Sequence, residues 1–360
     1  MQEFYSLIVK DSIENDVIEQ IRKERLPLYI WGCGEIAHIL LDYMEDKNIL
    51  IAGFIVDAGF QANVKNYLTT TFDKLREVGI QYNLLMGHSQ YEKMRIIKDK
   101  YDNIQNVFYF VSLCYGQYEP IPLDFYERNK ELYFHTYQLL EDDISRNCLV
   151  AYLNTRISNN IEYVLDCFQG SQNYFRNDIY VVGDNESYVD VGAYDGDSIQ
   201  EFLRECNRKY ARITAIEPNV KNFQELEHFV KTKGLENIDL IQCGTWKENT
   251  LLSASGENQN FSVSECNKGE TISVRTLDDI IDSKEISLIK INFYQGVQET
   301  ILGGSQTLRR CLPKMAIAIG FDEWALINIP PLLKQIVPEY KLYLRYNSSI
   351  PAKLVLYVVR

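Results

Sequence analysis

The sequence predicts an α/β fold in which two sheet-containing domains are joined by a helical connector. The chain has 360 residues, which is too long for one ordinary hydrophobic core. Apolar, strand-like runs alternate with helical periodicity in two separate stretches, a pattern typical of parallel sheets. Between them lie longer helical runs without glycine until Gly170. We therefore expect domains over residues 1–118 and 184–360, with the connector over 119–183.

Composition and charge narrow the class of protein. With 46% hydrophobic and 24% charged residues and no low-complexity run, the chain is expected to be globular. Its formal charge of −13, without a basic stripe, argues against a nucleic-acid partner, because Lys and Arg supply most of the attraction to phosphate backbones. No apolar run approaches the roughly 20 residues that cross a bilayer, and the N-terminus lacks a signal-peptide pattern. We expect a cytoplasmic protein, without a membrane span, that acts on small molecules or glycans.

The eight cysteines and four histidines are dispersed along the chain. No Cys-x-x-Cys pair occurs among them, and this spacing favours neither a zinc site nor a disulfide framework. We therefore expect no bound metal and a reducing environment.

The first domain contains a strand, a glycine turn and a helix in the segment LPLYIWGCGEIAHILLDYM. Gly32, Gly34 and Ala37 match the pattern G-x-G-x-x-A, and Asp57 ends the next predicted strand. This spacing is typical of dinucleotide or nucleotide-sugar sites in Rossmann-like domains. A later strand places His88 at the same sheet edge, either near a ligand phosphate or as a structural loop residue. The pattern fits equally well a Rossmann-like unit kept as a scaffold or as the surface of a homodimer.

The most informative motif is YVDVGAYDGDS, near the start of the last segment. An apolar strand there leads to Asp190, and Gly192 and Gly196 precede a helix. Glycine lets the backbone approach a ligand closely, and a helix N-terminus presents unpaired amide donors. About 20 residues further on, the strand TAIE ends in Glu217, whose carboxylate can accept both ribose hydroxyls of a nucleoside. The alternative is a turn and a surface carboxylate without a ligand.

These motifs connect the sequence with a known family. Residues 187–360 resemble the FkbM-type family of S-adenosylmethionine-dependent methyltransferases. The matching pieces are VDVGAYDGDS, AIEPN, CGTW, VRTLDDII, LIKIN with Gly296 and a following LGG, YKLYLRY, and QNYF at residues 172–175. The resemblance implies a Rossmann-like sheet of the class I methyltransferase type that ends in an antiparallel hairpin.

The resemblance also implies a cofactor, S-adenosylmethionine, and the residues around it. Glu217 is assigned to the ribose and residues 243–245 to the adenine edge, while the glycine turn receives the methionine part. The full set is Asp190, Gly192, Ala193, Asp195, Gly196, Ser198, Glu217, Cys243, Gly244, Thr245 and Asn292. The implied reaction is O-methylation of a sugar, nucleotide-sugar or related small metabolite, as in glycan biosynthesis. Such an in-line displacement needs an aligned acceptor oxygen and a group that takes its proton.

The sequence departs from the family at the positions whose side chains are expected to take that proton. Relatives usually carry Asp-x-Glu-Gly-x-Glu after the fourth strand, whereas the segment IKINFYQGVQE carries the amides Asn292, Gln295 and Gln298. An amide keeps the shape of an acid but loses its charge, and it cannot act as a general base at neutral pH. The family's Tyr-His pair is replaced by GFDEW, and its Arg-His pair by Arg345 and Tyr346.

Two hypotheses follow from these departures. In the first, the protein is an enzyme whose reaction centre uses Asn292 and Gln295 as polar groups, with Asp322, Glu323 or Tyr294 as the base, or with no base at all. In the second, it is a catalytically silent protein that binds S-adenosylmethionine for regulation or for a partner. A different transfer from the same cofactor is a third possibility. The intact cofactor motifs favour the enzyme, although Asp322 and Glu323 also fit a solvated loop.

Overall fold

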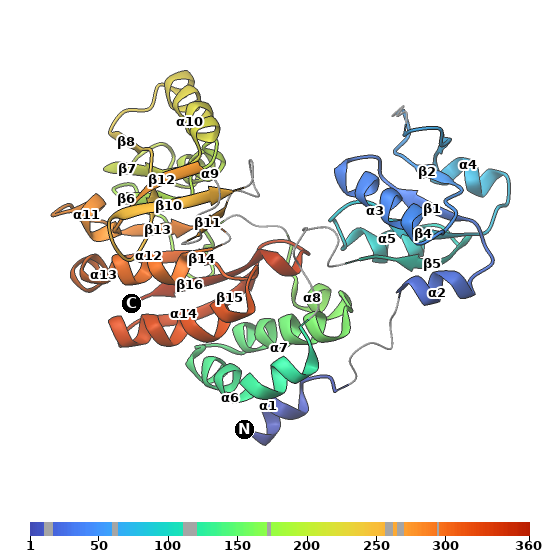
Figure 1. Ribbon diagram of the computed structural model, residues 1–360, viewed down its shortest axis with the longest axis horizontal. Helices are drawn as coiled ribbons and strands as arrows, with labels where there is room; N and C mark the ends of the chain where they lie inside the picture. The colour runs from blue at the N-terminus through green and yellow to red at the C-terminus, as the bar shows by residue number, and fades with distance from the viewer. Residues whose placement is uncertain are drawn as a thin grey trace. The chain divides into compact units, whose positions relative to one another are not determined.

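Figure 1 shows the computed structural model of the chain. The structure describes residues 1–10, 17–59, 64–110, 121–170, 174–255, 262–264, 270–293 and 295–360. The contacts divide the chain into two compact units. Unit 1 comprises residues 1–130, 150–169 and 348–351, and unit 2 comprises residues 131–149, 170–347 and 352–360.

Unit 1 is built on a five-stranded parallel sheet with the order β3-β2-β1-β4-β5. Its strands are β1 (Leu28–Trp31), β2 (Gly53–Ile55), β3 (Thr69–Thr70), β4 (Tyr82–Met86) and β5 (Ile104–Phe108). Its helices around the sheet are α2 (Val17–Lys23), α3 (Glu35–Asp46), α4 (Phe72–Glu77) and α5 (Lys93–Lys100). Strand β4 is buried at every position, as expected for a parallel sheet covered on both faces. This arrangement confirms the predicted Rossmann-like sheet.

The predicted helical stretch between the two sheets is also present. It contains α6 (Leu123–Leu139), α7 (Asp143–Ser158) and α8 (Glu162–Cys167), while α1 (Gln2–Ser6) lies at the start of the chain. The aromatic side chains Tyr126, Tyr133 and Tyr152 are buried, so they serve packing. Helices α6 and α7 each contribute residues to both units. The predicted boundaries of residues 1–118, 119–183 and 184–360 stay predictions.

Unit 2 is built on a seven-stranded sheet with the order β15-β16-β14-β13-β6-β7-β8. Its strands are β6 (Ser187–Val191), β7 (Arg212–Ile216), β8 (Ile238–Ile241), β13 (Leu288–Ile291), β14 (Lys314–Ala318), β15 (Lys341–Tyr346) and β16 (Leu354–Val359). Strands β6, β7, β8, β13 and β14 are parallel, whereas β16 is antiparallel to both β14 and β15. The predicted second Rossmann-like sheet and its closing hairpin are therefore confirmed.

The helices of unit 2 follow from the order of these strands. They are α9 (Asp197–Glu205), α10 (Val220–Lys233), α11 (Leu277–Ile281), α12 (Val297–Gly303), α13 (Ser305–Cys311) and α14 (Glu323–Ile336). The chain moves outward in opposite directions from β6 and from β13, so right-handed crossovers place α9 and α10 on one face and α12 to α14 on the other. Helices α11 to α14 contact one another and form the group drawn in orange and red in Figure 1.

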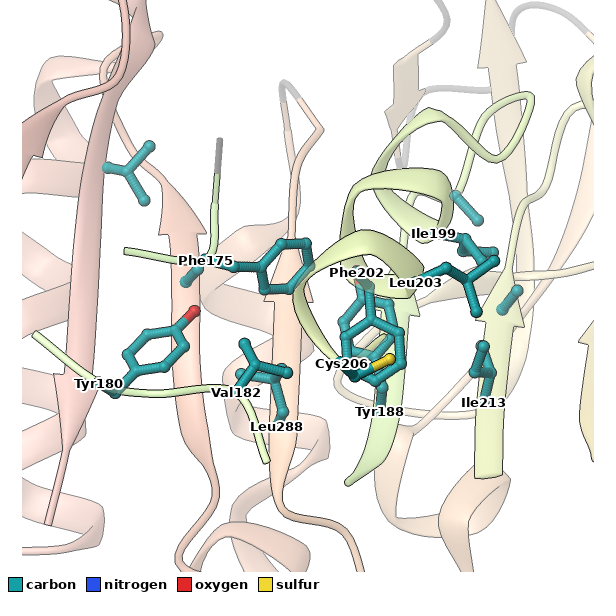
Figure 2. Close-up of a cluster of buried hydrophobic side chains, with 14 of the residues drawn as sticks. Phe175, Tyr180, Val182, Tyr188, Ile199, Phe202, Leu203, Cys206, Ile213 and Leu288 are labelled. Atoms are coloured by element: carbon teal, nitrogen blue, oxygen red, sulfur yellow. The ribbon is translucent and has the colours of Figure 1, made fainter. Parts of the chain in front are cut away.

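Helix α9 is fixed on the sheet by an apolar stripe. Its residues Ile199, Phe202 and Leu203 recur at three- and four-residue spacing and are buried. Figure 2 shows Phe202 against Tyr188 of β6, and their rings stack with centroids 4.5 Å apart. Phe175, from the segment QNYF, packs on both rings at 5.7 Å. Burying an aromatic side chain of this kind contributes about 1.5–3 kcal/mol, so this cluster fixes the position of the turn between β6 and α9.

Unit 2 also contains a small four-stranded sheet with the order β11-β10-β12-β9, which the sequence analysis did not predict. Its strands are β9 (Gly244–Thr245), β10 (Thr250–Ser255), β11 (Ser262–Ser264) and β12 (Glu270–Arg275). The alternation in TLLSAS and ETISVR is the signal that indicates such strands. Within the segment CGTW, Cys243 lies between β8 and β9, and β9 pairs with β12 of the small sheet.

Candidate functional site

The candidate site lies where the strand order of the large sheet reverses, between β6 and β13. Ligands of open α/β sheets bind at the carboxyl ends of strands at such a point. Val191 and Ile291 are paired at these ends, and Gly192 and Asn292 follow them. A Cβ atom on Gly192 would lie 2.5 Å from the carbonyl oxygen of Asn292, and the φ of Gly192 is +75°. Only glycine fits there.

The turn after β6 is held by its own backbone. The N–H groups of Gly192 and Ala193 both donate to the carbonyl oxygen of Ile216, at 3.0 Å each. Gly196 has φ +93° and begins α9, and a Cβ atom on it would lie 2.6 Å from the ring of Phe229. Ala193 is completely buried in the core. The turn is therefore preorganised, with the N-terminus of α9 directly behind it.

Asp195 lies in this turn and is half-buried. Its carboxylate accepts the N–H of Asp197 at 3.2 Å. Burial raises the pKa of Asp195, and the nearby charge of Asp197 raises it further. A second negative group close to this carboxyl would therefore be unfavourable, whereas a hydrogen-bond donor or a cation would be favourable.

Glu217 directly follows β7 and faces the same turn. Its side chain is buried, with 5% of the residue exposed. One carboxylate oxygen accepts the N–H of Tyr194 at 3.0 Å, and the other accepts the N–H of Asn219 at 2.9 Å. Burial raises the pKa of this carboxyl, and the backbone hydrogen bonds oppose that rise. The side-chain amide of Asn222 also donates to the oxygen that accepts from Asn219, at 3.5 Å. Because each carboxylate oxygen has about two lone-pair positions, the oxygen that faces Tyr194 can still accept one hydroxyl, and a second hydroxyl would have to displace the long contact with Asn222.

Lys290, which the sequence analysis missed, is the second buried charge of the site. Its Nζ donates to Asp190 Oδ1 and to the carbonyl oxygen of Gly192, both at 2.8 Å, and lies 5.6 Å above the ring of Tyr174. The hydroxyl of Ser198 donates to the other oxygen of Asp190 at 2.6 Å. Asp190 and Ser198 are completely or almost completely buried, so both side chains lie beneath the turn. A charged residue inside the apolar run SLIKIN is the signal that points to Lys290.

The predicted adenine edge follows β8. Cys243, Gly244 and Thr245 are buried. Burial raises the pKa of the Cys243 thiol to about 11, so the thiol is neutral at pH 7. The hydroxyl of Thr245 lies 2.6 Å from the hydroxyl of Thr300 on α12. These residues join the small sheet to α12, and the Thr245 hydroxyl already has a partner.

The predicted reaction centre lies between the starts of α12 and α14. Asn292 is half-buried beside Gly192, whereas Gln295 and Gln298 are exposed. Tyr294 lies outside the described residues. Asp322 accepts the N–H of Trp324 at 2.9 Å and thereby caps α14, as a loop aspartate commonly does.

A cavity of about 140 Å³ opens between these two helix starts. Residues of the β13–α12 and β14–α14 loops and of the first turns of α12 and α14 line it, including Phe293, Gln298, Glu299, Phe321, Asp322 and Trp324. Two of these residues are acidic and three are aromatic. The cavity wall therefore combines aromatic rings with polar groups, among them two carboxylates.

The predicted site in unit 1 lies at the reversal point of the smaller sheet, between β1 and β4. Gly32 has φ +106°, and a Cβ atom on it would lie 3.2 Å from the carbonyl oxygen of Gly87. Gly34 precedes α3 and has open space around it. Ala37 is completely buried, while Asp57 is exposed after β2. The glycine turn and the acid thus lie at the same edge of one parallel sheet.

His88 lies beside this turn. Its ring packs edge-on against Trp31, with centroids 4.4 Å apart, and its Nδ1 accepts the N–H of Gln90 at 3.3 Å. Burial lowers the pKa of His88 to about 4, so the imidazole is neutral at pH 7. The packing on Trp31 is the structural role that the sequence analysis gave as one alternative.

Other features of the described residues bear on metals and membranes. Within the described ranges, no group of three or more His, Cys, Asp or Glu residues is arranged to hold a metal ion. Across that same part of the chain, no helix combines the length and apolarity needed to span a membrane. Among the described cysteines, Cys33, Cys206, Cys243 and Cys311 carry free thiols.

The comparisons with known proteins agree with this geometry. A solved structure, the methyltransferase FkbM from Methylobacillus flagellatus KT, is similar to this chain with a TM-score of 0.69 and 20% identity, over 99% of this chain and 98% of that chain. At that identity the likeness shows the fold alone. Residues 190–340 match the family model of the methyltransferase FkbM domain. The C-terminal part of this chain therefore carries an FkbM-type methyltransferase domain.

Two further solved structures are similar over about half of this chain. An rRNA methylase from Streptococcus thermophilus has a TM-score of 0.30 and 16% identity, over 49% of this chain and 87% of that chain. Fibrillarin from Aeropyrum pernix, solved with natively bound S-adenosyl-L-methionine, has a TM-score of 0.34 and 12% identity, over 50% and 69%. Likeness at this level carries no argument about this protein. Among curated proteins, none matches the chain.

Proposed function

We propose that this protein is an S-adenosylmethionine-dependent methyltransferase that methylates a hydroxyl group of a sugar, a nucleotide-sugar or a related small metabolite. One observation carries the proposal. The buried carboxylate of Glu217 faces a preorganised glycine turn at the reversal point of a sheet that carries an FkbM-type domain. A nucleoside with a charged amino-acid tail is the ligand that uses both features.

The residues fit this cofactor in three respects. Glu217 keeps one lone pair for a ribose hydroxyl, on the oxygen that faces Tyr194, and the second hydroxyl displaces the long contact with Asn222. The absence of a side chain at Gly192 lets the turn after β6 approach the carbonyl oxygen of Asn292 closely. The backbone of residues 192–196, with Asp195 beside it, receives the methionine part. Cys243, Gly244 and Thr245 border the adenine. The cofactor supplies a methyl group on a positively charged sulfur.

Asp190, Ser198 and Lys290 act from beneath the turn in this proposal. Their side chains are hydrogen-bonded to one another and buried, so their contribution is to hold the turn in place. Because the ammonium of Lys290 also binds the Gly192 carbonyl, it fixes the direction in which the next N–H groups point. Rigid support of this kind is what a binding site needs to keep its geometry.

The acceptor lies beside Asn292 and enters from the cavity between α12 and α14. Its aromatic wall suits a ring with an apolar face, and Asn292 and Gln295 can donate hydrogen bonds to hydroxyl groups. Tyr294 and Asp322 remain candidates for contact with the acceptor. A sugar ring has both an apolar face and several hydroxyls, which supports a glycan-type acceptor.

Unit 1 is proposed to hold a nucleotide or a nucleotide-sugar of its own. The support is the glycine turn of Gly32 and Gly34 at the reversal point of its sheet, with Ala37 packed beneath it and Asp57 at the end of the neighbouring strand. Isothermal titration of the protein with uridine diphosphate and adenosine diphosphate tests this part. Binding of either nucleotide that Gly34→Asp abolishes supports a nucleotide site in unit 1. If neither nucleotide gives a heat of binding, this proposal is contradicted.

The first experiment tests the cofactor. Calorimetry with S-adenosylmethionine is expected to show binding, and Glu217→Ala is expected to weaken that binding by at least about tenfold, since the net worth of hydrogen bonds to a charged group is about 1.5–3 kcal/mol. Glu227→Ala, at an exposed position on α10, is the matched control and should bind like the unaltered protein. Equal affinity in both variants would contradict the ribose assignment.

The second experiment separates an enzyme from a silent binding protein, which is the alternative that the amides Asn292, Gln295 and Gln298 favour. The protein is incubated with methyl-labelled cofactor and a panel of nucleotide-sugars. Label in an acceptor supports the enzyme, whereas tight cofactor binding without transfer supports the silent protein. Activity that arises only after Asn292→Asp, Gln295→Glu and Gln298→Glu are combined would also show that the native domain is silent.

A further inference from the structure

Lys353 is brought to the candidate site by the closing hairpin. Strand β16 runs antiparallel to β14, with Val355 opposite Ala318, so the residue before β16 lies beside the end of β14. The N–H groups of Ile319 and Gly320 both donate to the carbonyl oxygen of Leu354, at 3.0 and 3.1 Å. The backbone of Lys353 is therefore fixed at the same sheet edge that carries the glycine turn.

The side chain of Lys353 is half-buried and faces charged groups of the site. Its Nζ lies 5.8 Å from the centre of the Phe321 ring, and Phe321 lines the cavity described above. Asp197 and Glu201 of α9 and Lys290 of β13 are the charged groups that act on it. Among the described residues, none of the carboxylates lies within 4.0 Å of this ammonium group, in contrast to Lys290, which is paired with Asp190.

The surroundings of Lys353 favour its neutral form. Burial lowers the pKa of the amine below its ordinary value of 10.5. The negative charges of Asp197 and Glu201 oppose that change and the positive charge of Lys290 adds to it, but burial prevails. A lysine in such a setting has a larger fraction of free amine near neutral pH, which is the state that a general base needs.

We propose that Lys353 is the general base of the methyl transfer. This inference rests on the proposed function. The acceptor oxygen forms a bond to the methyl carbon while the carbon–sulfur bond of the cofactor breaks, and that bonding electron pair passes to sulfur, giving S-adenosylhomocysteine. The hydroxyl proton of the acceptor passes to the neutral Nζ of Lys353, which becomes an ammonium group and later releases the proton to water.

This role explains how the family's acidic residues can be absent. Asn292, Gln295 and Gln298 cannot take a proton at neutral pH. The carboxylate of Asp322 caps α14. Lys353 reaches the same edge from a different strand, so the proton acceptor is moved from the β13–α12 loop to the start of β16.

The ionisation of Lys353 can be measured without any acceptor. The full chain is labelled with acetic anhydride over a range of pH, and mass spectrometry follows the peptides that contain Lys353 and the exposed Lys341, which serves as internal reference. The reactivity of Lys353 is expected to rise with a midpoint below pH 10.5, and Glu201→Gln is expected to move that midpoint lower still. A midpoint at or above 10.5 overturns the proposal.

The role as a base is tested by measuring kcat for Lys353→Arg and Lys353→Gln. The acceptor is the nucleotide-sugar that receives label in the panel experiment described above. Loss of a general base typically costs about 10²–10⁴-fold in rate, so kcat is expected to fall at least about a hundredfold in both variants, while the Kd for S-adenosylmethionine changes less than about threefold. The unaltered protein is expected to show a kcat that rises with pH, and this rise should be absent in both variants. Lys341→Gln is the control.

The other outcomes contradict the proposal in distinguishable ways. A Lys353→Arg variant that keeps its kcat would show that a positive charge is sufficient, and hence that no proton is taken. Weakened cofactor binding with unchanged kcat would make Lys353 a counter-ion of the cofactor's carboxylate. If the unaltered protein does not bind S-adenosylmethionine, the proposed function fails, whereas the acetic anhydride midpoint reports on Lys353 independently.

Discussion

Lys290 and Asp190 are directly opposite one another on the neighbouring strands β13 and β6, and their side chains form a buried ion pair with an Nζ–Oδ1 distance of 2.8 Å. Only 2% of the lysine side chain and 0% of the aspartate side chain are exposed. The same ammonium group binds the carbonyl oxygen of Gly192. The pair therefore couples the two strands two residues before Gly192 and Asn292, where the turns of the candidate site begin.

Replacing only one partner of this pair should destabilise unit 2 strongly. Lys290→Met leaves the carboxylate of Asp190 buried without its counter-charge, and such losses are about 3–5 kcal/mol in the free energy of unfolding. The double variant Asp190→Leu with Lys290→Met removes both charges and should be less destabilised than Lys290→Met alone. Urea unfolding of the three proteins measures this. A single variant as stable as the unaltered protein would contradict the pairing.

Gly192→Ala should damage both folding and cofactor binding. The added Cβ would lie 2.5 Å from the carbonyl oxygen of Asn292 at a φ of +75°, so the two turns have to move apart. Gly234→Ala is the matched control, because Gly234 also has a positive φ of +59° but has open space around it. We expect the control to lose about 1 kcal/mol of stability and to keep its affinity for S-adenosylmethionine. Calorimetry and thermal unfolding distinguish the two variants.

Acid should weaken unit 2 through Asp142. Burial alone would raise the pKa of this carboxyl, but hydrogen bonds from Arg345 and Ser145 outweigh it and hold the pKa at about 2, below the ordinary value of 3.8. The folded state therefore binds fewer protons than the unfolded state. The stabilisation is present above pH 3.8 and is lost as the pH falls through about 2.

The variant Asp142→Asn checks this assignment. The guanidinium of Arg345 donates to both oxygens of Asp142, at 2.6 and 3.2 Å, and Arg345 is itself buried. Asp142→Asn should be less stable than the unaltered protein at pH 7 and should show a flatter pH dependence below pH 4. The urea midpoints of the two proteins, measured between pH 7 and below pH 4, test this expectation. Parallel curves for the two proteins would remove Asp142 as the cause.

His88 should make unit 1 sensitive to mild acid. Burial holds its pKa at about 4, below the ordinary value of 6.5, so the folded state disfavours the protonated ring. The stability that depends on neutral His88 is present above pH 6.5 and is lost as the pH falls through about 4. In His88→Phe, which keeps an aromatic ring against Trp31, the thermal unfolding of unit 1 should depend less on pH over this range. An unchanged dependence would assign the sensitivity to another group.

Much of the fold could be predicted from the sequence because its signals are local. The apolar run before Trp31 and the glycine turn after it predicted β1 and the start of α3, and SYVDVGAYDGDS did the same for β6 and α9. Alternation of strands and helices predicted parallel sheets, and the two apolar runs near the C-terminus predicted the hairpin of β15 and β16. The small sheet was missed because its short strands are held by pairing over long sequence distances.

What the sequence determined by itself was therefore the order of elements, the two glycine turns and the acid Glu217 at the end of its strand, since each depends on neighbours along the chain. Only the tertiary structure decided that Asp190 binds Lys290, one hundred residues away, instead of facing solvent. It also decided that Lys353 lies beside Phe321 at the site. Charges in a protein are stabilised or suppressed by groups that folding brings close in space, and spacing along one chain does not record that proximity.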